Sequence, residues 1–94
     1  MKYRLVARID TDDPASLRPV IDRIVKRQNG TLRALARGFE IELDCEGASS
    51  RDLNRDLLTE LRRTVKKTRL RAEWTSGGTT EKFFDYVMKG VRKA

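Results

Sequence analysis

The sequence predicts an α+β fold in which two helices cover one face of an antiparallel sheet. Three observations predict it. Residues 39–46 alternate strictly between apolar and acidic side chains, as a strand with one buried and one wet face does. Two segments with apolar residues at helical spacing each follow an alternating segment. The 94-residue length fits a single domain, with its core in residues 1–75 and a further helix in residues 79–94.

The first strand is expected over residues 2–10. Apolar side chains share its inner face, and they are Tyr3, Leu5, Ala7 and Ile9. Asp13 is expected to cap the next helix, with Pro14 at its first position. Because a proline inside a helix removes a backbone hydrogen bond, the regular helix is expected to begin near Pro19. Asn29 and the glycine after it supply the left-handed stop.

Residues 31–37 and 39–46 are expected to form a hairpin around a two-residue turn at Arg37-Gly38. This register pairs apolar residues on the inner face, namely Leu32 with Leu43, Ala34 with Ile41 and Ala36 with Phe39. It also sets Arg33 opposite Glu42 on the wet face, a favourable cross-strand pair. A three-residue turn is rejected because a slip of one residue would invert both faces.

The remaining elements follow from similar patterns. Ser49 resembles the start of a capping box, and the helix after it is expected to run to about Lys67. Residues 69–74 alternate as a fourth strand, and residues 75–79 read as a flexible loop. The C-terminal helix is indicated by apolar residues at helical spacing, namely Phe83, Phe84, Val87, Met88 and Val91.

This order of elements closes most simply as the ferredoxin-like βαββαβ plait, with strand order 4-1-3-2 and an extra C-terminal helix. The acidic strand then lies between two strands with basic outer residues, so their exposed face should be nearly neutral. The aromatic residues Tyr3, Phe39 and Trp74 point inward, so base stacking on the sheet face is not expected. The glycine-rich loop of acylphosphatases and the Cys-x-x-Cys pair of copper chaperones are missing from the loop after the first strand.

Charge and cysteine usage limit the partners. The net charge of +7 favours polyanions such as RNA or DNA, although it can also serve solubility alone. Cys45 is the single cysteine, so no intramolecular disulfide forms and a reducing cytoplasmic location is expected. The first residues lack an apolar signal core and no run is long enough for a membrane span, so no membrane partner is expected.

The strongest candidate site is a cluster of basic residues that could form a nucleic-acid-binding patch. Its members are Arg62, Arg63, Lys66, Lys67, Arg69 and Arg71, extended by Lys82, Lys89, Arg92 and Lys93. Such clusters neutralise phosphates and release counterions. Alternatively, bases at the end of a helix complement its dipole and lie on a solvated face.

The C-terminal apolar stripe is the second candidate site. As an exposed patch it would form a homodimer or bind a protein partner through Phe83, Phe84, Val87, Met88 and Val91. Alternatively, the segment seals one end of the core.

Two smaller features have simple explanations. The loop at residues 76–80 could hold an anion before a helix, although an ordinary cap accounts for it. The acidic cluster at residues 10–13 could hold Mg²⁺, although a capped turn explains it equally well, so no metal or cofactor is assigned.

Catalysis is not expected. The chain has no histidine, and Cys45 lies in an inward phase without a base beside it. The first hypothesis is therefore a noncatalytic cytosolic accessory protein that binds the backbone of RNA or DNA. The second is an oligomeric protein-interaction subunit without nucleic-acid contact.

Overall fold

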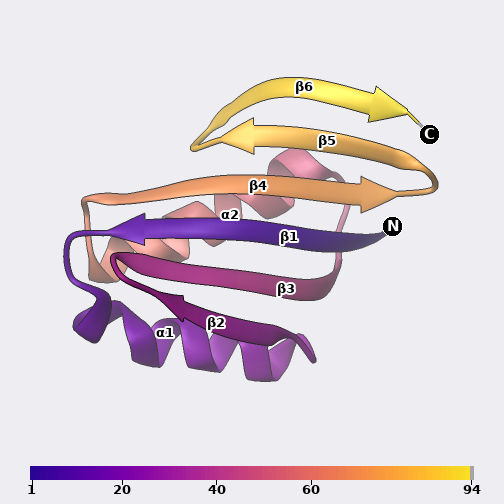
Figure 1. Ribbon diagram of the computed structural model, residues 1–94. Coiled ribbons are helices and arrows are strands. Elements are labelled where there is room, and N and C mark those ends of the chain that lie inside the picture. The colour runs from indigo at the N-terminus through magenta and orange to yellow at the C-terminus, as the bar shows by residue number, and fades with distance from the viewer. Residues whose placement is uncertain (94) are drawn as a thin grey trace.

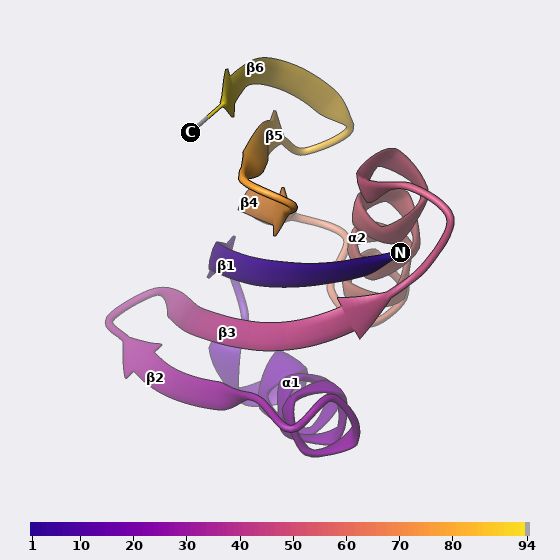
Figure 2. The same cartoon turned by 90° about the vertical axis from the view of Figure 1, so that its right-hand side faces the viewer.

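The computed structural model describes residues 1–93, which form one six-stranded antiparallel sheet and two helices (Figure 1). In chain order the elements are β1 (Lys2–Thr11), α1 (Pro14–Arg27), β2 (Thr31–Leu35), β3 (Gly38–Glu46), α2 (Ser50–Thr64), β4 (Thr68–Ser76), β5 (Thr79–Phe84) and β6 (Val87–Lys93). The strand order across the sheet is β2-β3-β1-β4-β5-β6. Both helices lie on the same side of the sheet, so its other face is open (Figure 2).

The expected four-stranded ferredoxin-like plait of order 4-1-3-2 is wrong, because the sheet has six strands. The expected C-terminal helix over residues 79–94 is also wrong: residues 79–93 form the β5–β6 hairpin, and residue 94 lies outside the described residues. Around the two-residue turn, Phe84 pairs with Val87 and Phe83 with Met88. The two pairs place apolar residues at intervals of three (84 to 87) and four (83 to 87 and 84 to 88) in the sequence, which matches the helical repeat.

The acidic strand β3 behaves as predicted. Phe39, Ile41 and Leu43 are buried, while the carboxylates between them lie on the open face. β3 pairs with β1 on one side and with β2 on the other. The prediction that this stripe is an extended strand between two basic neighbours is therefore confirmed.

The predicted register of the β2–β3 hairpin is wrong by two residues. The turn is formed by residues 36 and 37, and Arg33 lies opposite Glu40 instead of Glu42. An even shift leaves every side chain on its predicted face. Gly38 belongs to β3 because it passes so close to β1 that a Cβ atom there would collide with the Ile9 carbonyl oxygen.

Both helices have the predicted N-terminal caps. Asp13 caps α1 by accepting a hydrogen bond from the Ser16 N–H (3.2 Å), and Ser49 caps α2 by accepting one from the Asp52 N–H (3.1 Å). The expectation of a regular helix only from Pro19 is wrong, since α1 begins at Pro14 and keeps Pro19 at an exposed position.

The core lies between the helices and the covered face of the sheet. Its fully buried side chains include Leu5, Ile9, Leu17, Ile21, Ile41, Leu43, Leu58, Leu61, Leu70 and Trp74. The inward aromatic residues Tyr3 and Trp74 meet edge to face, with ring centroids 6.4 Å apart. Burial of these apolar side chains is the main source of folding stability. Because the side chains on the open face do not belong to this core, they can be charged.

A buried polar network ties the β5–β6 hairpin to the rest of the molecule. The Asn54 side chain on α2 donates to the Asp85 carbonyl (2.6 Å) and accepts from the Trp74 indole N–H (3.1 Å). Asp85 occupies the left-handed region (φ 54°) in the β5–β6 turn, and its carboxylate accepts a hydrogen bond from the Leu70 N–H (3.0 Å). The hairpin is therefore fixed to both α2 and β4.

Candidate nucleic-acid interface

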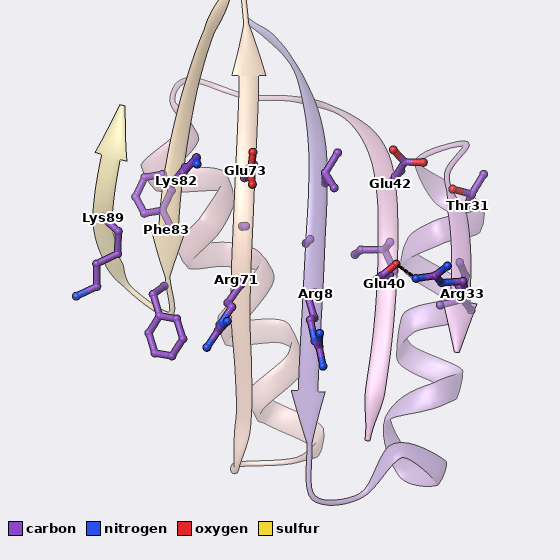
Figure 3. A pocket seen from close by; sticks show the side chains of 16 residues that line it. Arg8, Thr31, Arg33, Glu40, Glu42, Arg71, Glu73, Lys82, Phe83 and Lys89 are labelled. Atoms are coloured by element: carbon purple, nitrogen blue, oxygen red, sulfur yellow. Dashed lines mark hydrogen bonds and ion pairs between the residues drawn. The ribbon is translucent and has the colours of Figure 1, made fainter. Parts of the chain in front are cut away.

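The open face of the sheet is organised as rows of side chains that cross the strands. One row crosses all six strands in the order Arg33, Glu40, Arg8, Arg71, Phe84 and Val87. Figure 3 looks onto this face, with both helices behind the strands. The face divides into a β1–β3 half, where acids and bases alternate, and a β4–β6 half, where bases predominate.

In the β1–β3 half, acids and bases pair with one another. Arg4 contacts Asp44 at 3.0 Å and Arg33 contacts Glu40 at 2.6 Å. The side chains of these pairs are largely exposed, so each pair contributes little to the free energy of unfolding. Their consequence is electrostatic, because the carboxylates of β3 lie beside cations and this half has the nearly neutral character expected.

The β4–β6 half, which we name the basic half-face, carries five cations and one carboxylate. The cations are Arg69, Arg71, Lys82, Lys89 and Arg92, and the carboxylate is Glu73. Glu73 contacts Arg92 at 3.8 Å. Within residues 1–93 the other four cations form no salt bridge. This surface therefore has positive charge available to an anionic ligand.

Two arginines face each other across neighbouring strands at the border of the basic half-face. Arg8 on β1 is the direct cross-strand partner of Arg71 on β4, and Figure 3 shows both side chains pointing the same way. Like charges in such a pair repel each other. Arg8 has one carboxylate contact, to Asp10 at 3.4 Å. An anion bound between the two guanidinium groups would relieve the repulsion.

Phe84 lies on the open face, whereas Tyr3, Phe39 and Trp74 point inward as expected. It is only partly buried, and the Arg71 and Arg69 guanidinium carbons lie 5.1 and 5.8 Å from its ring centroid. Its place on the sheet was not predicted, because the apolar spacing of this segment favours a helix. The β-favouring run from Thr79 to Phe84, followed by an aspartate turn, was the available signal for a strand.

An open hollow of about 830 Å³ lies over this face. It is lined by residues from every strand, including Arg8, Arg33, Glu40, Arg71, Phe84 and Lys89. Figure 3 shows Arg71 on its floor and Lys89 at its edge. The hollow has the size of a ligand site, although it is open to solvent.

The other basic residues predicted for the patch separate into two groups. Arg62 is engaged within the fold: it donates to the Thr68 carbonyl (2.9 Å), contacts the Asp85 carboxylate (3.4 Å) and lies 5.4 Å from the Tyr86 ring centroid. Its charge is therefore less available than predicted. Arg63, by contrast, is exposed on α2.

Lys66 and Lys67 lie at one end of the sheet, where the β2–β3 turn brings Arg37 beside them. These residues line a second open hollow of about 810 Å³ together with Arg8 and Arg69. Since Arg8 and Arg69 also belong to the open face, the positive charge continues from the end of the sheet onto the basic half-face. Lys93 is exposed at the far end of β6.

The predicted apolar interface stripe does not form one surface. Phe83 is buried in the core and Met88 packs against it, whereas Phe84 lies on the open face. Val87 and Val91 are exposed on the edge strand β6 (55% and 53%). The alternative that this segment helps to seal the core thus applies to Phe83 and Met88.

Other candidate sites have structural roles. No helix follows the loop at residues 76–80, which is the β4–β5 turn with Gly77 and Gly78 at positive φ, so the proposed helix-terminal anion site is wrong. Hydrogen bonds from Ser16 hold the pKa of Asp13 below its usual value. No group of three acidic or thiol side chains that could hold a metal ion is found within residues 1–93.

The thiol of Cys45 is half-buried on β3. Burial is the main cause that raises its pKa, the Asp44 carboxylate raises it further, and Arg27 opposes both. A raised pKa keeps the thiol protonated at neutral pH, so the group is a poor nucleophile.

In the part of the chain that the structure describes, neither helix has the length and apolar composition needed to cross a membrane.

The chain was compared with protein-family models, curated proteins and solved structures, and none of the three comparisons gave a match.

Proposed function

We propose that the protein is a noncatalytic accessory protein that binds nucleic acid, with RNA as the favoured polymer, in the cytosol. The observation that carries this proposal is the basic half-face, where four of five cations form no salt bridge within residues 1–93. The free thiol of Cys45 supports a reducing compartment.

Phosphate binding explains this charge distribution better than solubility alone does. Solubility requires charges that are dispersed and mixed in sign, as they are on the β1–β3 half. On the basic half-face, and at the end of the sheet near Lys66 and Lys67, cations gather without acids in equal number. A polymer of phosphates would neutralise several of them at once and release its counterions.

A pair of variants of equal charge tests the proposal. Arg71→Gln with Lys89→Gln removes two cations from the basic half-face, whereas Arg23→Gln with Lys26→Gln removes two exposed cations from α1. Binding of a fluorescent RNA strand is measured by anisotropy over a range of salt concentrations. Each phosphate contact to a single strand contributes about 0.7 to the slope of log K against log salt, so the first variant should lower the slope by about 1.4.

The control variant should keep the wild-type slope, because both proteins have the same net charge. Equal loss in the two variants would mean that only total charge matters, and that result would contradict a site on the basic half-face. Absence of RNA binding by the wild-type protein at low salt would contradict the proposed function as a whole.

Oligomerisation through β6 is the second candidate function. It is supported by Val87 and Val91, which are exposed on a strand that has a neighbour on one side only. Antiparallel pairing of two β6 strands would, however, bring their cations Lys89, Arg92 and Lys93 close to one another. Light scattering decides: a dimer mass that Val91→Lys reduces to one protomer supports this candidate, and one protomer in both proteins contradicts it.

A further inference from the structure

We infer that the basic half-face binds single-stranded nucleic acid by stacking one unpaired base on Phe84 while Arg8 and Arg71 hold a neighbouring phosphate. This inference rests on the proposed function and names the class of polymer. Such binding needs a flat apolar surface for the base and a phosphate site about one nucleotide away from it. The arrangement must also exclude a duplex.

Phe84 provides the flat apolar surface. The guanidinium carbons of Arg69 and Arg71 lie over its ring, 5.8 and 5.1 Å from the centroid, and the ring remains only partly buried although it neighbours Val87 on β6. Base stacking on an aromatic side chain tolerates every base because each base has a π-face. Arginine beside the ring adds a second planar group on which a base can stack.

The phosphate site lies in the same row of side chains. Arg8, Arg71 and Phe84 occupy adjacent strands, so successive members are separated by about one strand spacing, roughly 4.8 Å. Two guanidinium groups side by side can donate several hydrogen bonds to one phosphate. The three residues line the same hollow, whose volume of about 830 Å³ is sufficient for a nucleotide.

A duplex does not fit this arrangement. Its bases are already stacked on their neighbours, so none of them presents a free face to Phe84. A second strand would also extend over the β1–β3 half, where Arg4 lies beside Glu42 and Asp44, so its phosphates would meet a nearly neutral surface and gain little. A single strand can instead follow the basic half-face toward Lys66 and Lys67 at the end of the sheet.

Phe84→Ala separates base stacking from phosphate binding when three probes are compared: an oligouridylate strand, an abasic strand of equal length and a blunt-ended RNA duplex. The variant should bind oligouridylate about 5 to about 160 times more weakly than the wild type. Binding of the abasic strand and of the duplex should change less than about twofold, and the salt slope should stay constant because no phosphate contact is lost.

Two further variants control for folding and for ring shape. Phe84→Leu keeps an apolar side chain without a flat ring and should lose oligouridylate affinity as Phe84→Ala does. Phe84→Trp should restore it, and the new indole should lose fluorescence when oligouridylate binds. The only native tryptophan, Trp74, is buried and should give a constant background.

Different experimental results would contradict this inference and the proposed function. Full oligouridylate affinity in Phe84→Ala overturns stacking, while a reduced salt slope in Arg71→Gln with Lys89→Gln still supports phosphate binding. The inference would also be overturned if uridine monophosphate displaced oligouridylate at the concentration at which oligouridylate itself binds, because the site would then serve a free nucleotide.

Discussion

Replacing Asn54 with alanine should lower the free energy of unfolding by about 2–6 kcal/mol, because one buried and one part-buried polar group would lose their partner. Asn54 is 1% exposed, and its side chain bonds the Trp74 indole N–H and the Asp85 carbonyl. An unsatisfied buried group costs roughly 1–3 kcal/mol, and the variant leaves two groups without a partner. The loss is a large part of the roughly 5–15 kcal/mol that stabilises a domain.

Urea unfolding followed by far-ultraviolet circular dichroism measures this loss without relying on Trp74, whose own environment changes in the variant. Arg51→Ala is the matched control, since Arg51 is exposed on the same helix and should change the free energy by less than about 0.5 kcal/mol. Amide exchange should accelerate most in β5 and β6, which Asn54 fixes to α2. A loss below about 1 kcal/mol would mean that this network does not fix the C-terminal hairpin.

Three further predictions follow from local geometry. Gly38→Ala should cost about 3 kcal/mol in urea unfolding, because its Cβ would collide with the Ile9 carbonyl; a neutral effect would contradict the close passage of β3 along β1. Ser49→Ala should cost about 1 kcal/mol through loss of the bond from the Asp52 N–H, and an unchanged unfolding midpoint would contradict this cap. Because folding raises the pKa of Cys45, this residue should stabilise the folded state at pH values below the pKa of an unfolded cysteine, about 8.5. The stabilisation should be lost as the pH rises through the pKa of Cys45 in the folded protein. Comparison of wild type with Cys45→Ala between neutral and alkaline pH isolates this effect, and parallel profiles would contradict it.

The N-terminal part of the molecule was predictable because its signals are local and mutually consistent. The alternation of β3 determined its two faces, and Asp13 and Ser49 marked the helix starts through hydrogen bonds within one turn. The register of the β2–β3 hairpin was not predictable in this way. Gly38 resembles a turn residue in the sequence, and its position in the strand depends on the distant carbonyl of Ile9.

The C-terminal segment was not predictable because two structures give the same sequence pattern. Apolar residues at positions 83, 84, 87, 88 and 91 match one face of a helix, and they also match a hairpin whose paired residues flank a tight turn. Contacts with the rest of the fold decide between the helix and the hairpin. Asn54 bonds the turn, and β4 offers a free edge on which β5 can pair.

The candidate site was predictable in composition but not in geometry. Arg69, Arg71 and Lys89 were recognised from charge alone, and the fold brings them onto one face. Two features required the structure. Arg62 is held by Thr68 and Asp85, and Phe84 is turned toward the arginines.

Amide chemical-shift mapping during titration with a short oligouridylate shows where single-stranded nucleic acid binds, because each residue reports its own environment. If the strand lies on the basic half-face, the largest shifts should occur at Arg69, Arg71, Phe84 and Lys89, with α1 unaffected. Shifts confined to the helices, or spread evenly over all exposed lysines and arginines, would contradict binding on the basic half-face.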